Sequence, residues 1–436
     1  MIYQRRALQY RLDELRSALE GKIVDKLAER LNRPGNDRVA AMYEVVVLHG
    51  LSKCGTLQSE VALISGRRPD IKFEQGSLRF TADVVTVSDD GLDHDNPYYE
   101  LSKLIEEAKR KLNLPVGGLD LCVRSKRDRT KGGIRTVLLL PPRKHLRAFV
   151  QHRIVPKLRE QIAAGKSVLR IAIYDEDVGL DITIDPTKSP YSSGSFGGYD
   201  IPKIKDRNPL FNALKAKARQ LRGADGITGV IVGDGDCVAL TRRSANFDEV
   251  STRQIVEEFF RQYSSIDFVS VLSVRETRSS WGPAPPLIRN NDVNVFVRDG
   301  CDARSPLISL FCSAEKFFPK PAMMPVNGAL RAREDNYELG HHGGYTVSNS
   351  KVRLSLREFT EIFAGLRTLQ DNGARHVEAA HKFPQEPNPV QVIFSRNLRE
   401  GRLPVSIEIR KTDENDNDDW VDIRFGEKDP AITPLQ

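Results

Sequence analysis

The stretch that most constrains the fold of this chain lies at residues 66–89, which read GRRPDIKFEQGSLRFTADVVTVSD. Two apolar runs, at residues 71–73 and 78–87, are separated by a polar turn that contains a glycine. β-Branched residues dominate the second run, and such runs joined by a glycine-containing turn are typical of a β-hairpin. The hairpin predicts that Asp70, just before the first strand, lies close to Asp83 in the middle of the second.

Two neighbouring carboxylates limit what this hairpin can do chemically. Their negative charges repel unless a proton or a divalent cation lies between them. An acidic residue within an apolar strand is therefore either a structural polar group with satisfied hydrogen bonds or a metal ligand. For Asp83 considered alone, the sequence favours the structural interpretation.

The spacing of these acids along the hairpin is more informative than either acid alone. Pro69 and Asp70 at the start of one strand, with an acid in the middle of the next, resemble the PD-(D/E)XK nuclease superfamily, which has the restriction-endonuclease-like fold. The resemblance implies that Asp70 and Asp83 bind Mg²⁺ or Mn²⁺, and that a lysine two residues after the second acid helps to activate the attacking water. In this chain Val85 stands at that position. A glutamate on the first core helix often points toward the metal in this family, which implies Glu44 as a third acid.

The family tolerates migration of the lysine onto other elements, so a replacement can come from a helix. Residues 208–222 predict an amphipathic helix on which Lys217 lies on or beside the apolar face. An ammonium group there is costly unless it reaches solvent, a carboxylate or a phosphate. Lys217 therefore either extends to solvent or supplies the ammonium that Val85 cannot. Lys109, which flanks the apolar face of a helix expected at residues 98–112, is the second candidate.

The order of the expected elements extends the resemblance beyond the motif. A helix is expected at residues 37–51 and a strand at 57–64, before the hairpin, and a strand at 118–123 follows the helix at 98–112. This is the αβββαβ order of the nuclease core. We therefore expect an α/β fold of the restriction-endonuclease-like type, with a mixed sheet flanked by helices, over residues 38–312.

Two further segments flank this domain. In residues 1–37, apolar residues recur at three- and four-residue spacing, which predicts a helix that either caps the following domain or binds a partner. Residues 313–436 predict a C-terminal α+β accessory module with an acidic turn, DENDNDD, between its last two strands. Either segment is a candidate for homodimer or partner contacts. His341 and His342 lie in a glycine-flanked loop, where a loop role is favoured over a metal site.

The most informative charge feature is the segment at residues 124–159, which contains 12 Lys and Arg residues and one Asp. Its net charge of +11 exceeds the +7 of the whole chain, so the rest is slightly acidic. A localised basic segment favours a polyanion through phosphate contacts and counterion release, and a solvated basic helix is the alternative. The nucleic acid can be DNA or RNA, and DNA is favoured. The residues expected to contact it are Arg124, Lys126, Arg127, Arg129, Lys131, Arg135, Arg143, Lys144 and Arg147.

Composition argues against several other classes of protein. No apolar run approaches the roughly 18 residues that a membrane span needs, and the first residues lack the apolar core of a signal peptide. Five scattered cysteines without a CxxC pair argue against structural zinc and fit the reduced thiols of a cytosol. We therefore expect a cytoplasmic protein with no membrane role.

Two functions of different classes follow. The first is a divalent-metal-dependent nuclease that hydrolyses DNA phosphodiesters, with restriction or phage defence expected from where such folds commonly occur. The second is a nuclease-like module that has lost cleavage and serves as a nucleic-acid-binding or assembly subunit. The acids with a nearby basic segment favour the first, whereas Val85 and the use of Asp rather than Glu at position 83 favour the second.

Overall fold

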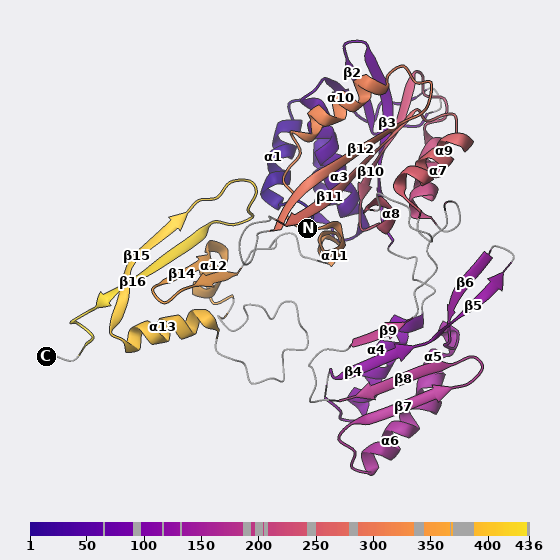
Figure 1. The fold of residues 1–436 in the computed structure, drawn as a ribbon. Helices are drawn as coiled ribbons and strands as arrows, with labels where there is room; N and C mark the ends of the chain where they lie inside the picture. The colour runs from indigo at the N-terminus through magenta and orange to yellow at the C-terminus, as the bar shows by residue number, and fades with distance from the viewer. Residues whose placement is uncertain are drawn as a thin grey trace. The chain divides into compact units, whose positions relative to one another are not determined.

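The structure is a computed structural model of the chain, in which contacts divide the residues into two compact units (Figure 1). The main unit comprises Met1–Asp89, Lys203–Arg375 and Gln385–Gln436, and we call the other, which lies within Asp90–Pro202, the inserted unit. The residues that the structure describes are 1–63, 66–89, 97–115, 117–130, 133–185, 193–196, 204, 208–241, 250–278, 287–334, 344–366, 368 and 388–433.

The main unit is built around a mixed six-stranded sheet with the order β1-β2-β3-β10-β11-β12. The central strands β3, β10 and β11 are parallel, and the outer pairs are antiparallel. The strands are β1 (Thr56–Gln58), β2 (Ile71–Gln75), β3 (Leu78–Val87), β10 (Ile227–Asp234), β11 (Phe268–Arg278) and β12 (Leu287–Val297).

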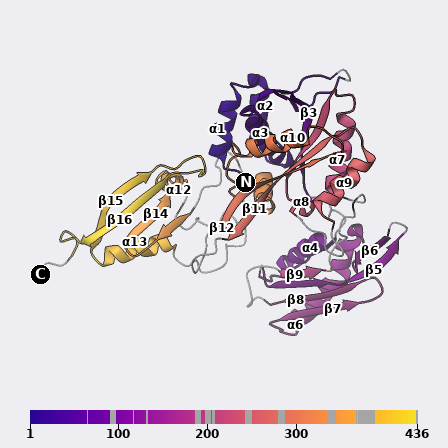
Figure 2. The same cartoon turned by 45° about the horizontal axis from the view of Figure 1, so that its top comes forward.

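Helices cover both faces of this sheet, and alternation along β3 assigns its residues to two cores. Phe80, Ala82 and Val84 face one core, and Val87 faces the other, with Val85 packed against it. The first core is closed by α1 (Arg5–Leu15), α2 (Gly21–Asn32), α3 (Asn36–Ser52), α10 (Arg304–Glu315) and α11 (Pro325–Glu334). The second is closed by α7 (Pro209–Gln220), α8 (Val238–Thr241) and α9 (Thr252–Gln262). Figure 2 shows α7 and α9 together on their side of the sheet.

The expected hairpin is confirmed. β2 and β3 pair in antiparallel register, with Ile71 opposite Ala82, and a two-residue turn joins them. Gly76 in that turn has φ of +59°, a conformation that glycine adopts without steric cost. The strand expected at residues 57–64 is shorter, because pairing with β2 stops at Gln58.

The expected core order requires a correction. The helix and strand predicted at residues 98–112 and 118–123 do form, as α4 (Pro97–Lys111) and β4 (Leu119–Val123), but β4 lies in a different sheet. In the main sheet the next helix and strand after the hairpin are α7 and β10, with the inserted unit between β3 and α7. The reason is that β3 pairs with β10, in parallel register from Phe80 opposite Ile227.

The inserted unit has a four-stranded sheet of its own, with the order β7-β8-β4-β9, and a separate hairpin, β5-β6. Its buried apolar residues come from one face of the sheet and from α4, α6 and the helical segment before α6. The remaining elements are β5 (Ser125–Thr130), β6 (Gly133–Leu138), α5 (Leu146–Phe149), α6 (Val155–Ala163), β7 (Leu169–Tyr174), β8 (Gly179–Ile184) and β9 (Ser193–Phe196).

The C-terminal module is a second small sheet within the main unit, with the order β13-β14-β16-β15 and helices over one face (Figure 1). The expected boundary at residues 312–313 falls inside α10, whose apolar side packs in the core of the main sheet. The elements are β13 (Tyr345–Val347), β14 (Lys351–Ser355), α12 (Leu356–Phe363), α13 (Pro389–Arg399), β15 (Arg402–Arg410) and β16 (Trp420–Lys428).

The N-terminal segment forms two helices, α1 and α2, where a single helix was expected. Leu8, Leu12 and Leu27 are buried in the core of the main sheet, so these helices cap the domain and their apolar face is not available to a partner. Polar residues of α1 contact the acidic turn of the C-terminal module, with ion pairs between Arg6 and Asp419 (3.0 Å) and between Arg11 and Glu414 (2.5 Å). Within the described ranges, no helix is long and apolar enough to cross a membrane.

Candidate active site

The hairpin brings the two predicted acids into contact. Asp70 precedes β2 and lies opposite Asp83 by continuation of the strand register. The backbone N–H of Asp70 donates to Asp83 Oδ1 (3.1 Å), and the N–H of Val84 donates to Asp70 Oδ2 (2.8 Å). Each carboxylate is thus fixed by a main-chain hydrogen bond, which orients its other oxygen.

Helix α7 supplies the predicted lysine to this pair. Lys217 Nζ lies 3.4 Å from Asp83 Oδ2 and 4.0 Å from Asp70 Oδ2. The side chain of Asp83 is only 4% exposed, whereas those of Lys217 and Asp70 are 18% and 26% exposed. The cluster is therefore enclosed at Asp83 and reachable from solvent at Asp70 and Lys217.

The position of Val85 explains why a helix can provide this ammonium group. Val85 and Asp83 are two residues apart on β3, so their side chains point to the same face of the sheet. Val85 packs against the core under α7 on that face. A lysine on α7 therefore approaches Asp83 from the side where a lysine at position 85 would lie.

Glu44 of α3 affects the same cluster through its charge. After burial, the Glu44 carboxylate is the next cause of the raised pKa of Asp70, and the Lys217 ammonium lowers the pKa of Glu44. Arg30 of α2 holds Glu44 through an ion pair of 2.6 Å. Burial raises the pKa of Glu44, and Arg30 opposes that rise. Sequence reasoning missed Arg30, because nothing in the periodicity of α2 shows which residue of α3 it meets.

The electrostatics of the cluster are those of a crowded acidic site. The pKa of Asp70 is raised to about 7, first by burial and then by the charge of Glu44, while Lys217 lowers it. Raised carboxyl pKa values of this kind are common at functional sites, although structural ion-pair networks produce them too.

The donor chemistry of the cluster suits a hard cation such as Mg²⁺, which prefers carboxylate oxygens. In the arrangement shown, however, the two aspartates surround an ammonium group. Within the described part of the chain, no three Asp, Glu, His or Cys side chains are grouped as a metal site. Asp70 and Asp83 are therefore the pair that would hold a cation, and Lys217 would have to yield space to it.

The second candidate lysine does not belong to a site of this kind. Lys109 is fully buried within the inserted unit, where its ammonium contacts Glu106 (2.9 Å) and the carbonyl of Gly117 (2.6 Å). It closes the C-terminal end of α4 against the following loop. Since it is enclosed there, its amine is not available to the acids of the main unit.

The cations of the basic segment whose side chains the structure describes are exposed, but acids from neighbouring elements partly neutralise them. Arg143 and Arg147 lie 3.7 Å from Glu100 and 3.9 Å from Glu107 of α4. The inserted-unit residues 90–202 contain 19 Lys and Arg against 15 Asp and Glu, a net charge of only +4.

Of the other residues predicted to contact nucleic acid, the structure describes the side chains of some but not of all. Arg124 stacks on the ring of Tyr174 at 4.2 Å, and Lys126 lies 3.7 Å from Asp177. Lys144 is exposed. Lys131, the side chains of Arg127, Arg129 and Arg135, and the pair His341 and His342 lie outside what the structure describes.

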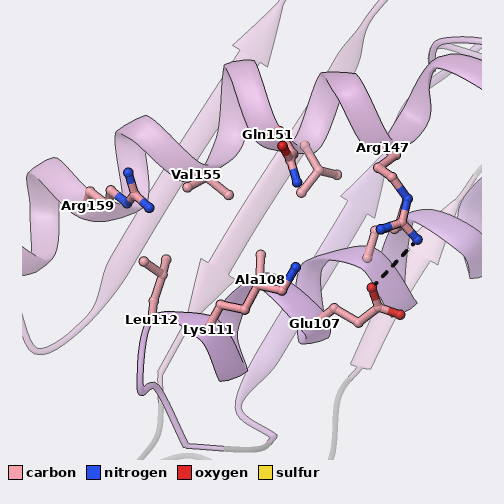
Figure 3. A pocket seen from close by; sticks show the side chains of 10 residues that line it. Glu107, Ala108, Lys111, Leu112, Arg147, Gln151, Val155 and Arg159 are labelled. Atoms are coloured by element: carbon pink, nitrogen blue, oxygen red, sulfur yellow. Dashed lines mark ion pairs between the residues drawn. The ribbon is translucent and has the colours of Figure 1, made fainter.

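A groove of about 220 Å³ lies between α4 and the helical segment that contains α5 and α6. Figure 3 shows Arg147, Lys111 and Arg159 along its rim, with Arg147 directed to Glu107. Its apolar lining comes from Leu104, Ala108, Leu112, Val150 and Val155. The groove gathers cations, but its floor is apolar, unlike a surface shaped for a phosphate backbone.

Comparisons of the chain with models of protein families, with curated proteins and with solved structures find no match. The arrangement of its own side chains therefore carries the functional argument.

Proposed function

We propose that the chain is a divalent-metal-dependent nuclease that hydrolyses phosphodiesters of DNA, with a core of the PD-(D/E)XK type. The observation that carries the proposal is the meeting of Asp70, Asp83 and Lys217 at one point. The β2–β3 hairpin carries the two acids, and α7, far away in the sequence, carries the lysine. The element order α3, β1, β2, β3, α7, β10 supports it, since this is the αβββαβ order with the inserted unit after β3.

Each residue of the cluster has a role in this proposal. Asp70 and Asp83 would hold Mg²⁺ or Mn²⁺, with Glu44 beside them. When bound, the metal lowers the pKa of a water ligand and stabilises charge at the scissile phosphate. Lys217 donates a hydrogen bond to the attacking water or to a phosphate oxygen, and the main-chain bonds to both aspartates hold their orientation.

A second candidate function is a nucleic-acid-binding or assembly subunit without cleavage. The observation that favours it is the contact of Lys217 with both aspartates, which balances their charge without a metal. Such a charged cluster would then be a structural ion-pair network. The basic segment of the inserted unit would contact phosphates in either case.

Cleavage of plasmid and single-stranded DNA, with Mg²⁺ or Mn²⁺ and with chelator, separates the two. We expect metal-dependent cutting that is lost in Asp70→Ala and in Asp83→Asn, which keeps an oxygen acceptor for the Asp70 N–H. Circular dichroism checks that both variants fold. Absence of cutting, together with DNA binding that weakens steeply with salt, would favour the second candidate. Cleavage of RNA in preference to DNA would correct the substrate.

A further inference from the structure

Strand β15 forms the outer edge of the C-terminal sheet, and among the described strands it has a neighbour, β16, on one side only (Figure 1). Ile407 and Ile409 of this strand are 60% and 58% exposed. The unpaired edge of a strand presents free N–H and C=O groups, and apolar edges of this kind pair readily with another strand. Pro404 and the register shifts between Arg402 and Ser406 protect the first part of this edge, whereas Ile407 and Ile409 lie in the regularly paired part that follows.

The register places these residues on the apolar face of the sheet. Ile407 lies opposite Ile423 and Ile409 opposite Val421, and both partners are buried under α12 and α13. The apolar face therefore continues onto β15, beyond the area that the two helices cover. An additional strand beside β15 would extend the sheet and bury part of this face.

The other face of β15 carries charges that have no ion-pair partner among the described residues. Glu408 lies opposite Asp422, a like charge, which is already paired with Lys351 (3.1 Å) and Arg353 (2.6 Å). Arg410 lies opposite Trp420. A second strand that offered a cation to Glu408 and an anion to Arg410 would complete this edge.

We propose that the occupant is β15 of a second copy of this chain, paired antiparallel about a two-fold axis at Ile409. In an antiparallel pair with this axis, Ile409 faces its own copy, and Glu408 faces Arg410 twice. Ile407 then lies against the aliphatic stem of Lys411. The strand thus supplies both the apolar contact and the opposite charges, as a two-fold interface requires.

The stretch of β15 that pairs regularly is short, and this limits the strength of the proposed dimer contact. Register shifts between Arg402 and Ser406 leave Ser406–Arg410 as the regularly paired stretch. One strand pair of this length is at the small end of protein interfaces. We therefore expect a weak dimer that forms as the protein concentration rises.

Charge-swap variants of the full chain test the pairing, with molar mass measured by analytical ultracentrifugation over a wide range of concentration. Glu408→Arg and Arg410→Glu each place like charges opposite each other, and each should weaken the dimer about tenfold or more. The double variant restores opposite charges and should recover dimerisation. Val347→Lys, on the opposite edge of the same sheet, is the control and should leave the dimer intact.

Cysteine cross-linking tests the register independently. Ile409→Cys should give a reducible dimer under mild oxidation, while Ile407→Cys should not, because its own copy is several residues away along the strands. Wild type gives the background from the five free cysteines. A protein that stays monomeric at every concentration would overturn the proposal. So would a dimer that both single swaps leave unchanged, or one that cross-links at position 407 in preference to 409. None of these measurements depends on nuclease activity, so they test the dimer separately from the proposed function.

Discussion

Helices α7 and α4 each bring a lysine to a carboxylate, but the two lysines have different surroundings. Lys217 of α7 contacts two acids of the hairpin and remains partly exposed. Lys109 of α4 contacts Glu106 of its own helix and a carbonyl of the next loop, with no exposure. The first can meet a ligand, whereas the second stabilises a helix end. A lysine beside an apolar helix face therefore does not by itself indicate a site.

Removal of Lys217 is the change that most directly tests the difference. In the proposed nuclease, Lys217 is a preorganised donor at the reacting phosphate, so we expect Lys217→Ala to lower DNA cleavage about 10²–10³-fold. The loss should lie in kcat measured at saturating metal. Lys109→Ala should keep activity per folded molecule, and equal losses in the two variants would contradict the separation of their roles.

Removal of Lys109 should act on stability. We expect Lys109→Met to lower the free energy of unfolding of the inserted unit by about 3 kcal/mol, because Glu106 and the Gly117 carbonyl lose a buried charged partner. Denaturant unfolding followed by circular dichroism measures the change. Lys103→Met, an exposed change on the same helix, is the control and should be near neutral.

The pH dependence of the free energy of unfolding shows whether Asp70 has a raised pKa or is simply ionised and paired with Lys217. Since the pKa of Asp70 is raised to about 7, its contribution to stability is fully present below its unfolded pKa and is lost as pH rises through 7. Asp70→Asn mimics the protonated form. We expect it to be more stable than wild type at pH 8, by on the order of 2 kcal/mol, and nearly equal at pH 4.

Chemical denaturation of both proteins at the two pH values measures this difference, without metal. Asp25→Asn, at an exposed position of α2, is the control. A difference that does not change with pH would mean that Asp70 is ionised throughout, paired simply with Lys217.

A lysine at position 85 should partly replace Lys217. Val85 shares the face of β3 that carries Asp83, so Val85→Lys in the Lys217→Ala background places an ammonium group near the same carboxylates. We expect recovery of cleavage by about tenfold, because the position is right but the orientation is not optimised. A folded double variant with no gain would indicate that only α7 can present this group.

The hairpin and its acid pair could be predicted from sequence because the interaction is local. Gly76 permits the tight turn, and the antiparallel register then places Asp70 beside Asp83 whatever the rest of the chain does. The amphipathic helices were likewise readable from their periodicity. Lys217 was predicted from the resemblance and from its helix position, and the structure brings it to the acid pair. Glu44, predicted as a third acid, pairs with Arg30 and affects Asp70 through its charge, and among the described residues it is not grouped with the two aspartates as a metal site.

Only the tertiary structure decided which strands pair in one sheet and which acidic side chains lie near each Lys or Arg side chain. Periodicity records how much of an element is buried, but not against what, so it could not show that β10, and not the expected strand β4, continues the core sheet. Charge counted along residues 124–159 likewise omitted Glu100 and Glu107, which folding brings to that segment. Contacts between residues distant in sequence depend on the packing of whole elements, and local sequence does not encode that packing.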